Sequence, residues 1–177
     1  MVIPTLAADA RLLECVAALE AQTWRDFEVI VVDNSGEALA RVLAGRPAVR
    51  LIEPPRNLGF GAAVNAAFRQ SGSPYLAALN DDTVPHPGWL AALLRAIQSR
   101  PDVGMCASQV RLFGEDALDS AGMLVAGDGS SKQRGHLRPP RLFPVAEEVL
   151  LPSGSAALYR RAMLDQIGLF DESFFFI

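Results

Sequence analysis

Cysteine and histidine are scarce in this chain of 177 residues. It contains two of each, and Cys15 and Cys106 lie far apart, with no CxxC pattern and no neighbouring histidine. We therefore expect neither a structural zinc site nor a disulfide framework. Both cysteines are predicted to be buried thiols in a reducing compartment, which favours a cytoplasmic protein.

The chain also lacks an excess of positive charge and any membrane-spanning run. Its formal net charge is −4, which argues against nucleic acid or an anionic membrane as the main partner. No apolar run approaches the ~20 residues of a membrane span, and no signal-peptide pattern opens the sequence. We expect no transmembrane segment, and a peripheral position at the inner face of the membrane is left open.

The length and the balance of residue types indicate one globular domain over residues 1–177. Half of the residues are hydrophobic and a fifth are charged, which is typical of a soluble domain with a sizeable core. Internal repeats, low-complexity segments and linkers are not found. The aromatic run at residues 174–177 would expose a large apolar surface at a free terminus, so we expect the parent chain to continue beyond it.

Apolar runs alternate with helical patterns through the first hundred residues, which predicts a parallel sheet with right-handed crossovers. From residue 103 onward the rhythm changes, and a smaller mixed or antiparallel portion is expected. The predicted strands are residues 2–5, 27–32, 49–52, 75–79, 103–112 and 121–125. The predicted helices are a segment after Asp9, a weaker one at 38–44, and residues 59–70, 89–98 and 161–167, with a mobile polar loop at 128–141.

Two adjacent carboxylates, Asp81 and Asp82, follow the apolar run that ends at Leu79. In an open α/β sheet the carboxyl ends of the strands are where ligands bind. Hard cations such as Mg²⁺ are held by one or two carboxylates together with substrate phosphates. The alternative is an Asx-rich turn that caps the next segment.

Polar side chains end two other predicted strands, at Thr5 and Asp33. Since the carboxyl ends of parallel strands share one edge, these groups are expected to converge with the acidic pair. A carboxylate such as Asp33 can accept a hydrogen bond from a nucleobase N–H. An Asx turn with Ser35 is the alternative for this residue.

The loop at residues 56–61 joins a predicted strand to a predicted helix. Backbone N–H groups at such a junction favour anions. A dinucleotide fingerprint is rejected, because Val64 stands where its third glycine is needed and because the loop does not follow the first strand. A helix start with glycine for close packing is the alternative, and Asn65 on the helix face would then bond a neighbouring backbone group.

Taken in order, six segments resemble the family 2 glycosyltransferases of the GT-A fold, and especially their rhamnosyltransferase-like branch. The resemblance covers nearly the whole chain. The segments are Val2-Ile3-Pro4-Thr5, Val31-Val32-Asp33-Asn34-Ser35, Arg56-Asn57-Leu58-Gly59-Phe60 with Asn65, Asn80-Asp81-Asp82-Thr83 with Trp89, Ser153-Gly154-Ser155-Ala156-Ala157-Leu158, and Ile167-Gly168-Leu169-Phe170-Asp171-Glu172.

The resemblance implies a GT-A-like three-layer α/β sandwich with a mostly parallel, Rossmann-like sheet. Residues 1–102 would form the nucleotide-sugar half, and residues 103–177 a partial acceptor-side half. The implied enzyme is an inverting transferase that moves a sugar, with rhamnose as a candidate, from a dTDP- or UDP-sugar to a hydroxyl of a glycan or lipid-linked acceptor. The expected partners include no nucleic acid.

The resemblance also implies roles for single residues. Asp33 would contact the base, Asp82 would hold Mg²⁺ or Mn²⁺ against the diphosphate, and the metal would act as a Lewis acid. The general base is expected just after Ile177, so this chain by itself is predicted to turn over poorly. The other expected substrate-binding residues are Pro4, Thr5, Asn57, Gly59, Asn65, Asn80, Asp81 and Gly154.

One departure and two other classes of protein bear on this assignment. Asn80 stands where many family members carry an aspartate. A non-catalytic module of the same fold, binding a nucleotide or a protein, remains an alternative. A nucleotidyltransferase is disfavoured, because residues 6–9 after the first strand are neither glycine-rich nor basic.

Overall fold

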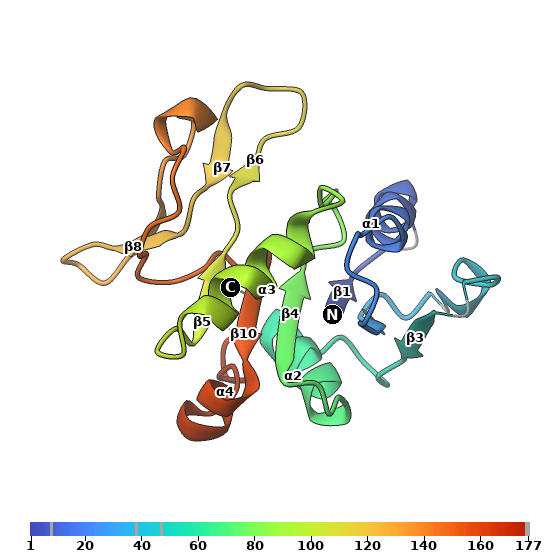
Figure 1. Ribbon diagram of the computed structural model, residues 1–177. Coiled ribbons are helices and arrows are strands. Elements are labelled where there is room, and N and C mark those ends of the chain that lie inside the picture. The colour runs from blue at the N-terminus through green and yellow to red at the C-terminus, as the bar shows by residue number, and fades with distance from the viewer. Residues whose placement is uncertain (8, 38, 47, 176–177) are drawn as a thin grey trace.

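A six-stranded sheet forms the centre of the molecule (Figure 1). The computed structural model describes residues 1–7, 9–37, 39–46 and 48–175. The strand order is β3-β2-β1-β4-β10-β5, with β1 to β4 parallel and β10 antiparallel to both of its neighbours. The sheet strands are β1 (Val2–Thr5), β2 (Val29–Asp33), β3 (Val49–Ile52), β4 (Tyr75–Leu79), β5 (Met105–Ala107) and β10 (Ala156–Arg160).

Helices cover both faces of the sheet, so the architecture is a three-layer α/β/α sandwich (Figure 1). Alternate side chains of each strand point to opposite faces: Val2 packs with α2 and α4, whereas Ile3 packs with α1. The third core cluster joins α3 to the strands β4 and β10. The helices are α1 (Ala10–Glu20), α2 (Phe60–Gln70), α3 (Trp89–Ser99) and α4 (Arg161–Ile167).

The helix boundaries follow local sequence signals. Asp9 caps α1, because its carboxylate accepts hydrogen bonds from the backbone N–H groups of Arg11 and Leu12. Gly59 precedes α2 with φ +78°, a conformation that glycine adopts without strain. The predicted helices after Asp9 and at 59–70, 89–98 and 161–167 are therefore confirmed, within one or two residues at each end.

Residues 109–152, which we call the hairpin region, form short antiparallel strands outside the main sheet (Figure 1). Strands β6 and β7 pair with each other, as do β8 and β9. These elements are β6 (Val110–Arg111), β7 (Leu118–Ser120), β8 (Met123–Val125), β9 (Ser131–Gln133) and the 3₁₀ turn η2 (Pro140–Leu142).

Three local expectations are corrected by the structure. The weak helix expected at 38–44 is reduced, among its described residues, to the 3₁₀ turn η1 (Leu39–Arg41), since a segment ended by Gly45 at φ +88° is too short to recover the cost of helix nucleation. The polar loop expected at 128–141 contributes β9 and η2. The strand expected at 103–112 divides into β5 and β6. Across the described ranges, none of the helices has the length and apolarity needed to cross a bilayer.

Candidate active site

Thr5 and Asp33 end two neighbouring parallel strands at the same edge of the sheet. They are register partners of β1 and β2, and both side chains are buried. Pro4 is the next residue of β1 inward from this edge and pairs in register with Val32. The predicted convergence of the first two strand ends is therefore present in the fold.

A hydrogen bond joins the acidic turn to this edge. The hydroxyl of Thr5 lies within hydrogen-bond reach of a carboxylate oxygen of Asp81, 76 positions away in sequence, and also of the carbonyl of Ala7. Because β1 lies beside β4 in the sheet, residues that follow the two strands meet. Thr5, Asp33 and Asp81 thus lie along one line of strand ends.

The carboxylate of Asp33 accepts four hydrogen bonds, three of them at one oxygen. One oxygen accepts from the backbone N–H and hydroxyl of Ser35 and from the N–H of Gly36, and the other accepts from the N–H of Leu39. Burial raises the pKa of Asp33, but these four hydrogen bonds outweigh it and hold the pKa below the ordinary value of 3.8. The Asx turn with Ser35 is therefore formed, and Asp33 is a fixed anion at neutral pH.

The turn after β4 is fixed through the carbonyl oxygen of Asn80. It accepts a hydrogen bond of 2.7 Å from the Thr83 hydroxyl and a longer one of 3.6 Å from the Cys15 thiol. Burial raises the pKa of Cys15 to about 12, so this residue is an inert thiol beneath the turn. Asp81 is partly buried and Asp82 is exposed.

The donor set at this turn fits a cation that is shared with a substrate. Within the described part of the chain, no group of three or more His, Cys, Asp or Glu side chains is arranged to hold a metal ion. Asp81 and Asp82 can offer one or two carboxylates. This is the typical protein contribution to a Mg²⁺ or Mn²⁺ site that is completed by phosphates. Arg11 lies within electrostatic reach: its pKa is raised chiefly by Asp9 and further by Asp81 and Asp82.

A groove of about 720 Å³ opens beside Asp82. It extends from the acidic turn along the start of α3 to the hairpin region, and Trp89 lies in its wall, where the indole N–H donates to the Ser108 hydroxyl at 2.9 Å. Asn80 also lines it, whereas Thr5 and Asp33 do not. The structure thus places Asp82 on the groove side of the turn and Asp81 on the side of β1.

The loop before α2 is tied to the end of β2 by Asn34, which sequence reasoning did not single out. Its buried side chain donates to the Gly59 carbonyl and accepts from the Leu58 N–H, both at 3.2 Å. Asn57 accepts from the Gly59 N–H at 2.8 Å. Asn57 and Gly59, which are predicted to contact the substrate, therefore lie at the same edge of the sheet as Asp33.

Two further predicted residues lie away from the strand ends. Asn65 is fully buried on α2 and bonds the backbone of Phe170, so the local role weighed for it, a hydrogen bond to the backbone, is present. Gly154 precedes β10 and lies against the ring of Phe60. Whether either residue touches a substrate stays a prediction, and the expected general base falls outside the described residues.

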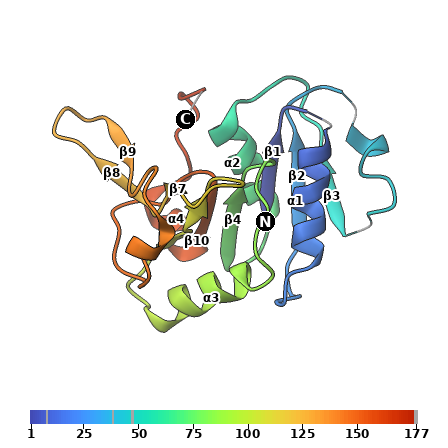
Figure 2. The same cartoon turned by 90° about the horizontal axis from the view of Figure 1, so that it is seen from above.

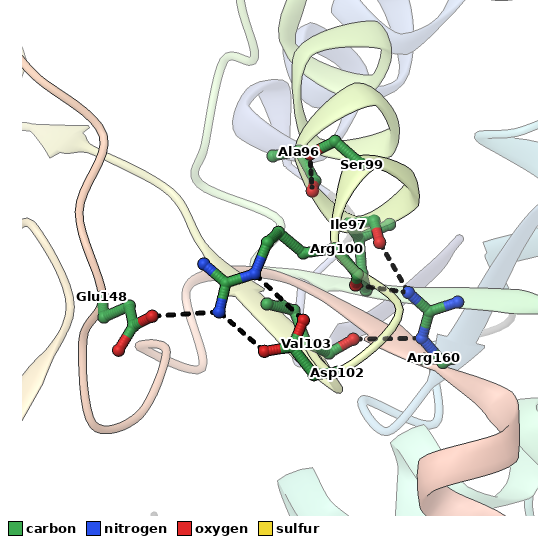
Figure 3. A network of polar contacts seen from close by, with 8 residues as sticks. All are labelled: Ala96, Ile97, Ser99, Arg100, Asp102, Val103, Glu148 and Arg160. Carbon is green, nitrogen blue, oxygen red and sulfur yellow. Dashed lines mark hydrogen bonds and ion pairs between the residues drawn. The ribbon is translucent and has the colours of Figure 1, made fainter.

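Two arginines, Arg160 at the end of β10 and Arg161 at the start of α4, bind helix ends to the sheet. No sequence motif predicted these contacts. Arg160 donates to the carbonyls of Ile97 at 2.5 Å and Arg100 at 3.1 Å, near the end of α3 (Figure 3). Arg161 donates to the carbonyls of Ser71 at 2.5 Å and Ser73 at 2.7 Å, just after α2. Cations near helix C-termini are stabilising, so these side chains hold the frame of the site.

Gln22 was also not predicted from the sequence. It is a fully buried amide that binds the loop after the acidic turn. Its side chain donates to the His86 carbonyl at 2.9 Å and accepts from the Leu90 N–H at 3.0 Å, at the start of α3. His86 itself is exposed. The only sequence signal was an amide in an otherwise polar loop, which is too common to be informative.

The chain matches known sequences along most of its length. The model of the family described as Glycosyl transferase family 2 matches residues 1–168. N-acetylglucosaminyl-diphospho-decaprenol L-rhamnosyltransferase of Mycobacterium tuberculosis (strain ATCC 25618 / H37Rv) is 30% identical over 99% of this chain and 65% of that protein. The uncharacterized glycosyltransferase YwdF of Bacillus subtilis (strain 168) is 26% identical over 97% of this chain and 61% of that protein. The chain thus spans somewhat less than two thirds of these relatives.

Solved structures share the fold at lower identity. The mannosyltransferase PcManGT of Pyrobaculum calidifontis, in complex with GDP-Man and Mn²⁺, superposes with a TM-score of 0.67 at 19% identity and covers 97% of this chain and 46% of its own. S. aureus TarS 1–349 in complex with UDP gives a TM-score of 0.68 at 18% identity, with 98% and 50% covered. The predicted GT-A-like sandwich is confirmed.

Proposed function

Because this chain belongs to glycosyl transferase family 2, we propose that it forms the donor-binding part of an inverting, metal-assisted glycosyltransferase. The reaction moves a sugar from a nucleoside diphosphate to an acceptor hydroxyl. In this proposal residues 1–102 are the nucleotide-sugar half and residues 103–177 belong to the acceptor side. The protein would act in the cytoplasm, with the inner face of the membrane as a second possible place.

The observation that carries the proposal is the contact between Thr5 and Asp81. It joins the acidic turn after β4 to the end of β1, whose register partner at the end of β2 is Asp33. One edge of the sheet therefore presents the carboxylate of Asp33 at one end and an exposed carboxylate, Asp82, at the other. A sugar nucleotide needs the same sequence of contacts, from the base through the ribose to the diphosphate.

Each predicted residue has a part in this arrangement. Asp33 would accept from the base at the oxygen that has a single hydrogen bond in this structure, and its four hydrogen bonds would keep it ionised and rigid. Asp81, oriented by Thr5, would accept from the ribose or the sugar. The remaining proposed substrate contacts are Pro4, Thr5, Asn57, Gly59, Asn65, Asn80 and Gly154.

Asp82 is the proposed metal ligand, and Mg²⁺ or Mn²⁺ is the proposed cofactor. A bound divalent cation would supply Lewis-acid stabilisation for the departing nucleoside diphosphate. The exposed position of Asp82, between the line of strand ends and the groove, leaves its carboxylate free to share a cation with phosphate oxygens. Support for the metal comes from PcManGT, which was solved with Mn²⁺.

The proposed donor is a UDP- or dTDP-sugar. UDP in TarS and GDP-Man in PcManGT support a nucleoside diphosphate sugar in general. Rhamnose as the sugar, and a glycan or lipid-linked acceptor, follow from the activity named for the mycobacterial relative.

The test is calorimetric titration of the chain with UDP and with dTDP, each with and without Mn²⁺. We expect Mn²⁺-dependent binding by the wild type and at least about tenfold weaker binding by Asp82→Ala, equivalent to about 1.4 kcal/mol. Asp165→Ala is the matched control, because Asp165 is exposed on α4 and, within the described residues, has no hydrogen bond or ion pair. Binding that is unchanged by both the metal and Asp82→Ala would overturn the metal assignment, and no binding at all would overturn the proposed function.

A further inference from the structure

Residues 170–175, which we call the strap, follow α4 and run along α2 (Figure 2). The strap begins at the middle of α2, where the fully buried side chain of Asn65 holds the backbone of Phe170. The Asn65 amide donates to the Phe170 carbonyl at 2.8 Å and accepts from its N–H at 3.0 Å. A buried amide with both of its groups satisfied fixes the position of the segment that it binds.

Glu172 strengthens this attachment from the solvent side. Its Oε1 accepts from the Asn65 amide at 2.9 Å and from the Arg69 guanidinium at 2.7 Å, one turn further along α2. The Phe170 ring packs edge-on against Phe60 and Tyr159, with centroid distances of 6.3 and 5.7 Å. The start of the strap is therefore latched by charge-assisted hydrogen bonds and aromatic packing together.

The other end of the strap lies over the loop that precedes α2. A Cβ on Gly59 would come within 2.5 Å of the Phe175 carbonyl and 3.1 Å of its ring, so only glycine permits this approach. The same loop is bound to the end of β2 by Asn34, the residue after Asp33. The strap thus reaches from the body of α2 to the edge of the sheet that carries the proposed nucleotide site.

We propose that Asn65 and Glu172 are positioning residues that hold the strap as one wall of the nucleotide site. This inference rests on the proposed function. If a nucleoside diphosphate binds beside a docked strap, the coupling is reciprocal. The bound ligand slows hydrogen exchange in the strap, and release of the strap lowers the affinity for the ligand. Asn65 then acts on the substrate through the strap.

The experiment measures hydrogen exchange of the strap amides with and without UDP and Mn²⁺, together with the Kd for UDP. Glu172→Ala removes the acceptor shared by Asn65 and Arg69 while leaving the core intact, because Glu172 is exposed. We expect about tenfold faster exchange in the strap, as the loss of a charge-assisted hydrogen bond implies, and a Kd for UDP raised by about three- to tenfold, with no change in the melting temperature.

Three further variants make the result specific. Glu172→Gln keeps the Oε1 acceptor and is expected to restore the Kd to within about twofold of the wild type. Glu148→Ala removes another exposed glutamate from an ion pair, with Arg100 at 3.0 Å, and is expected to change neither quantity (Figure 3). Asn65→Ala should reproduce Glu172→Ala if that variant folds.

The outcomes separate this inference from the proposed function. If UDP binds but leaves strap exchange unchanged, and Glu172→Ala binds UDP as the wild type does, the strap is only a structural element and the inference is wrong while the proposed function stands. If the wild type does not bind UDP or dTDP even at millimolar concentration, the proposed function fails and the role of the strap fails with it. Faster exchange with a raised Kd supports both.

Discussion

The sheet body and the hairpin region are stabilised in different ways. All three core clusters lie in the body, apart from Val110, which packs against one of them. The hairpin region instead exposes many large apolar side chains and carries ion pairs between exposed residues, such as Arg141 with Asp116 at 3.0 Å. The exposed apolar residues of this region are Phe113, Leu124, Val125, Leu137, Leu142, Val145, Leu150 and Leu151. The predicted site residues lie in elements of the body or next to them, so the comparison separates the part of the molecule that carries the proposed site from the hairpin region.

The largest expected difference comes from the same substitution in the two regions. Leu158→Ala in β10 removes a side chain that is 1% exposed and should cost about 3 kcal/mol of unfolding free energy. Leu124→Ala in β8, at a residue 47% exposed, should cost less than about 1 kcal/mol. Urea denaturation of both variants measures the gap. Equal losses of unfolding free energy would mean that Leu124 is packed as tightly as a core residue of the sheet.

Replacing an arginine in each region should give a smaller difference in the loss of unfolding free energy. Arg161→Met removes three hydrogen bonds to backbone carbonyls in the last turn of α2 and just after it, and should cost about 2 kcal/mol. Arg141→Met breaks an ion pair whose side chains are both mostly exposed and should cost less than about 0.5 kcal/mol. Thermal unfolding is the measurement, and a larger shift for Arg141→Met would contradict this account of the two regions.

A pH series gives the smallest effect. The pKa of Asp33 is lowered in the folded state, so its stabilising contribution is present above the ordinary carboxyl pKa of 3.8 and is lost as the pH falls through the lower folded value. Asp33→Asn should therefore be about 1 kcal/mol less stable than the wild type at pH 6, and the difference should shrink below pH 3.8.

The hairpin region offers a matched control for this series. Asp128 forms the same kind of turn with Ser130, at 2.9 Å to its N–H and 2.7 Å to its hydroxyl, but it is exposed. Asp128→Asn should therefore change the stability less than Asp33→Asn at pH 6. An Asp33→Asn difference that is constant from pH 6 to pH 3 would show that its carboxylate is not stabilised by folding.

The body could be predicted from the sequence because its signals are local. Continuous apolar runs marked β2 and β4, and Asp9 marked the start of α1. The convergence of Thr5 with the acidic turn also followed, since parallel strands share an edge. No local pattern shows which partner each side chain has. The Thr5–Asp81 contact spans 76 positions, and the hydrogen bonds of Asn34 and Gln22 depend on tertiary packing.

Strand β10 and the hairpin region were harder to predict, for physical reasons. The place of β10 between β4 and β5, antiparallel to both, is set by the sheet and not by the residues of β10 itself. Strand β9 is polar and exposed, so it carries no alternating pattern. It forms because the turn closed by the Ala126 N–H and the Ser130 carbonyl, with Gly129 at φ +83°, returns the chain to β8.

The central claim is that the strand ends of the body form one nucleotide–metal site. Paramagnetic broadening of backbone amide signals by Mn²⁺ with UDP, referenced to Mg²⁺ with UDP, tests it most directly. We expect strong broadening at Asp81 and Asp82, clear broadening at Thr5 and Gly59, and little at β8 and β9. Broadening centred on the hairpin region, or absent from the acidic turn, would contradict it.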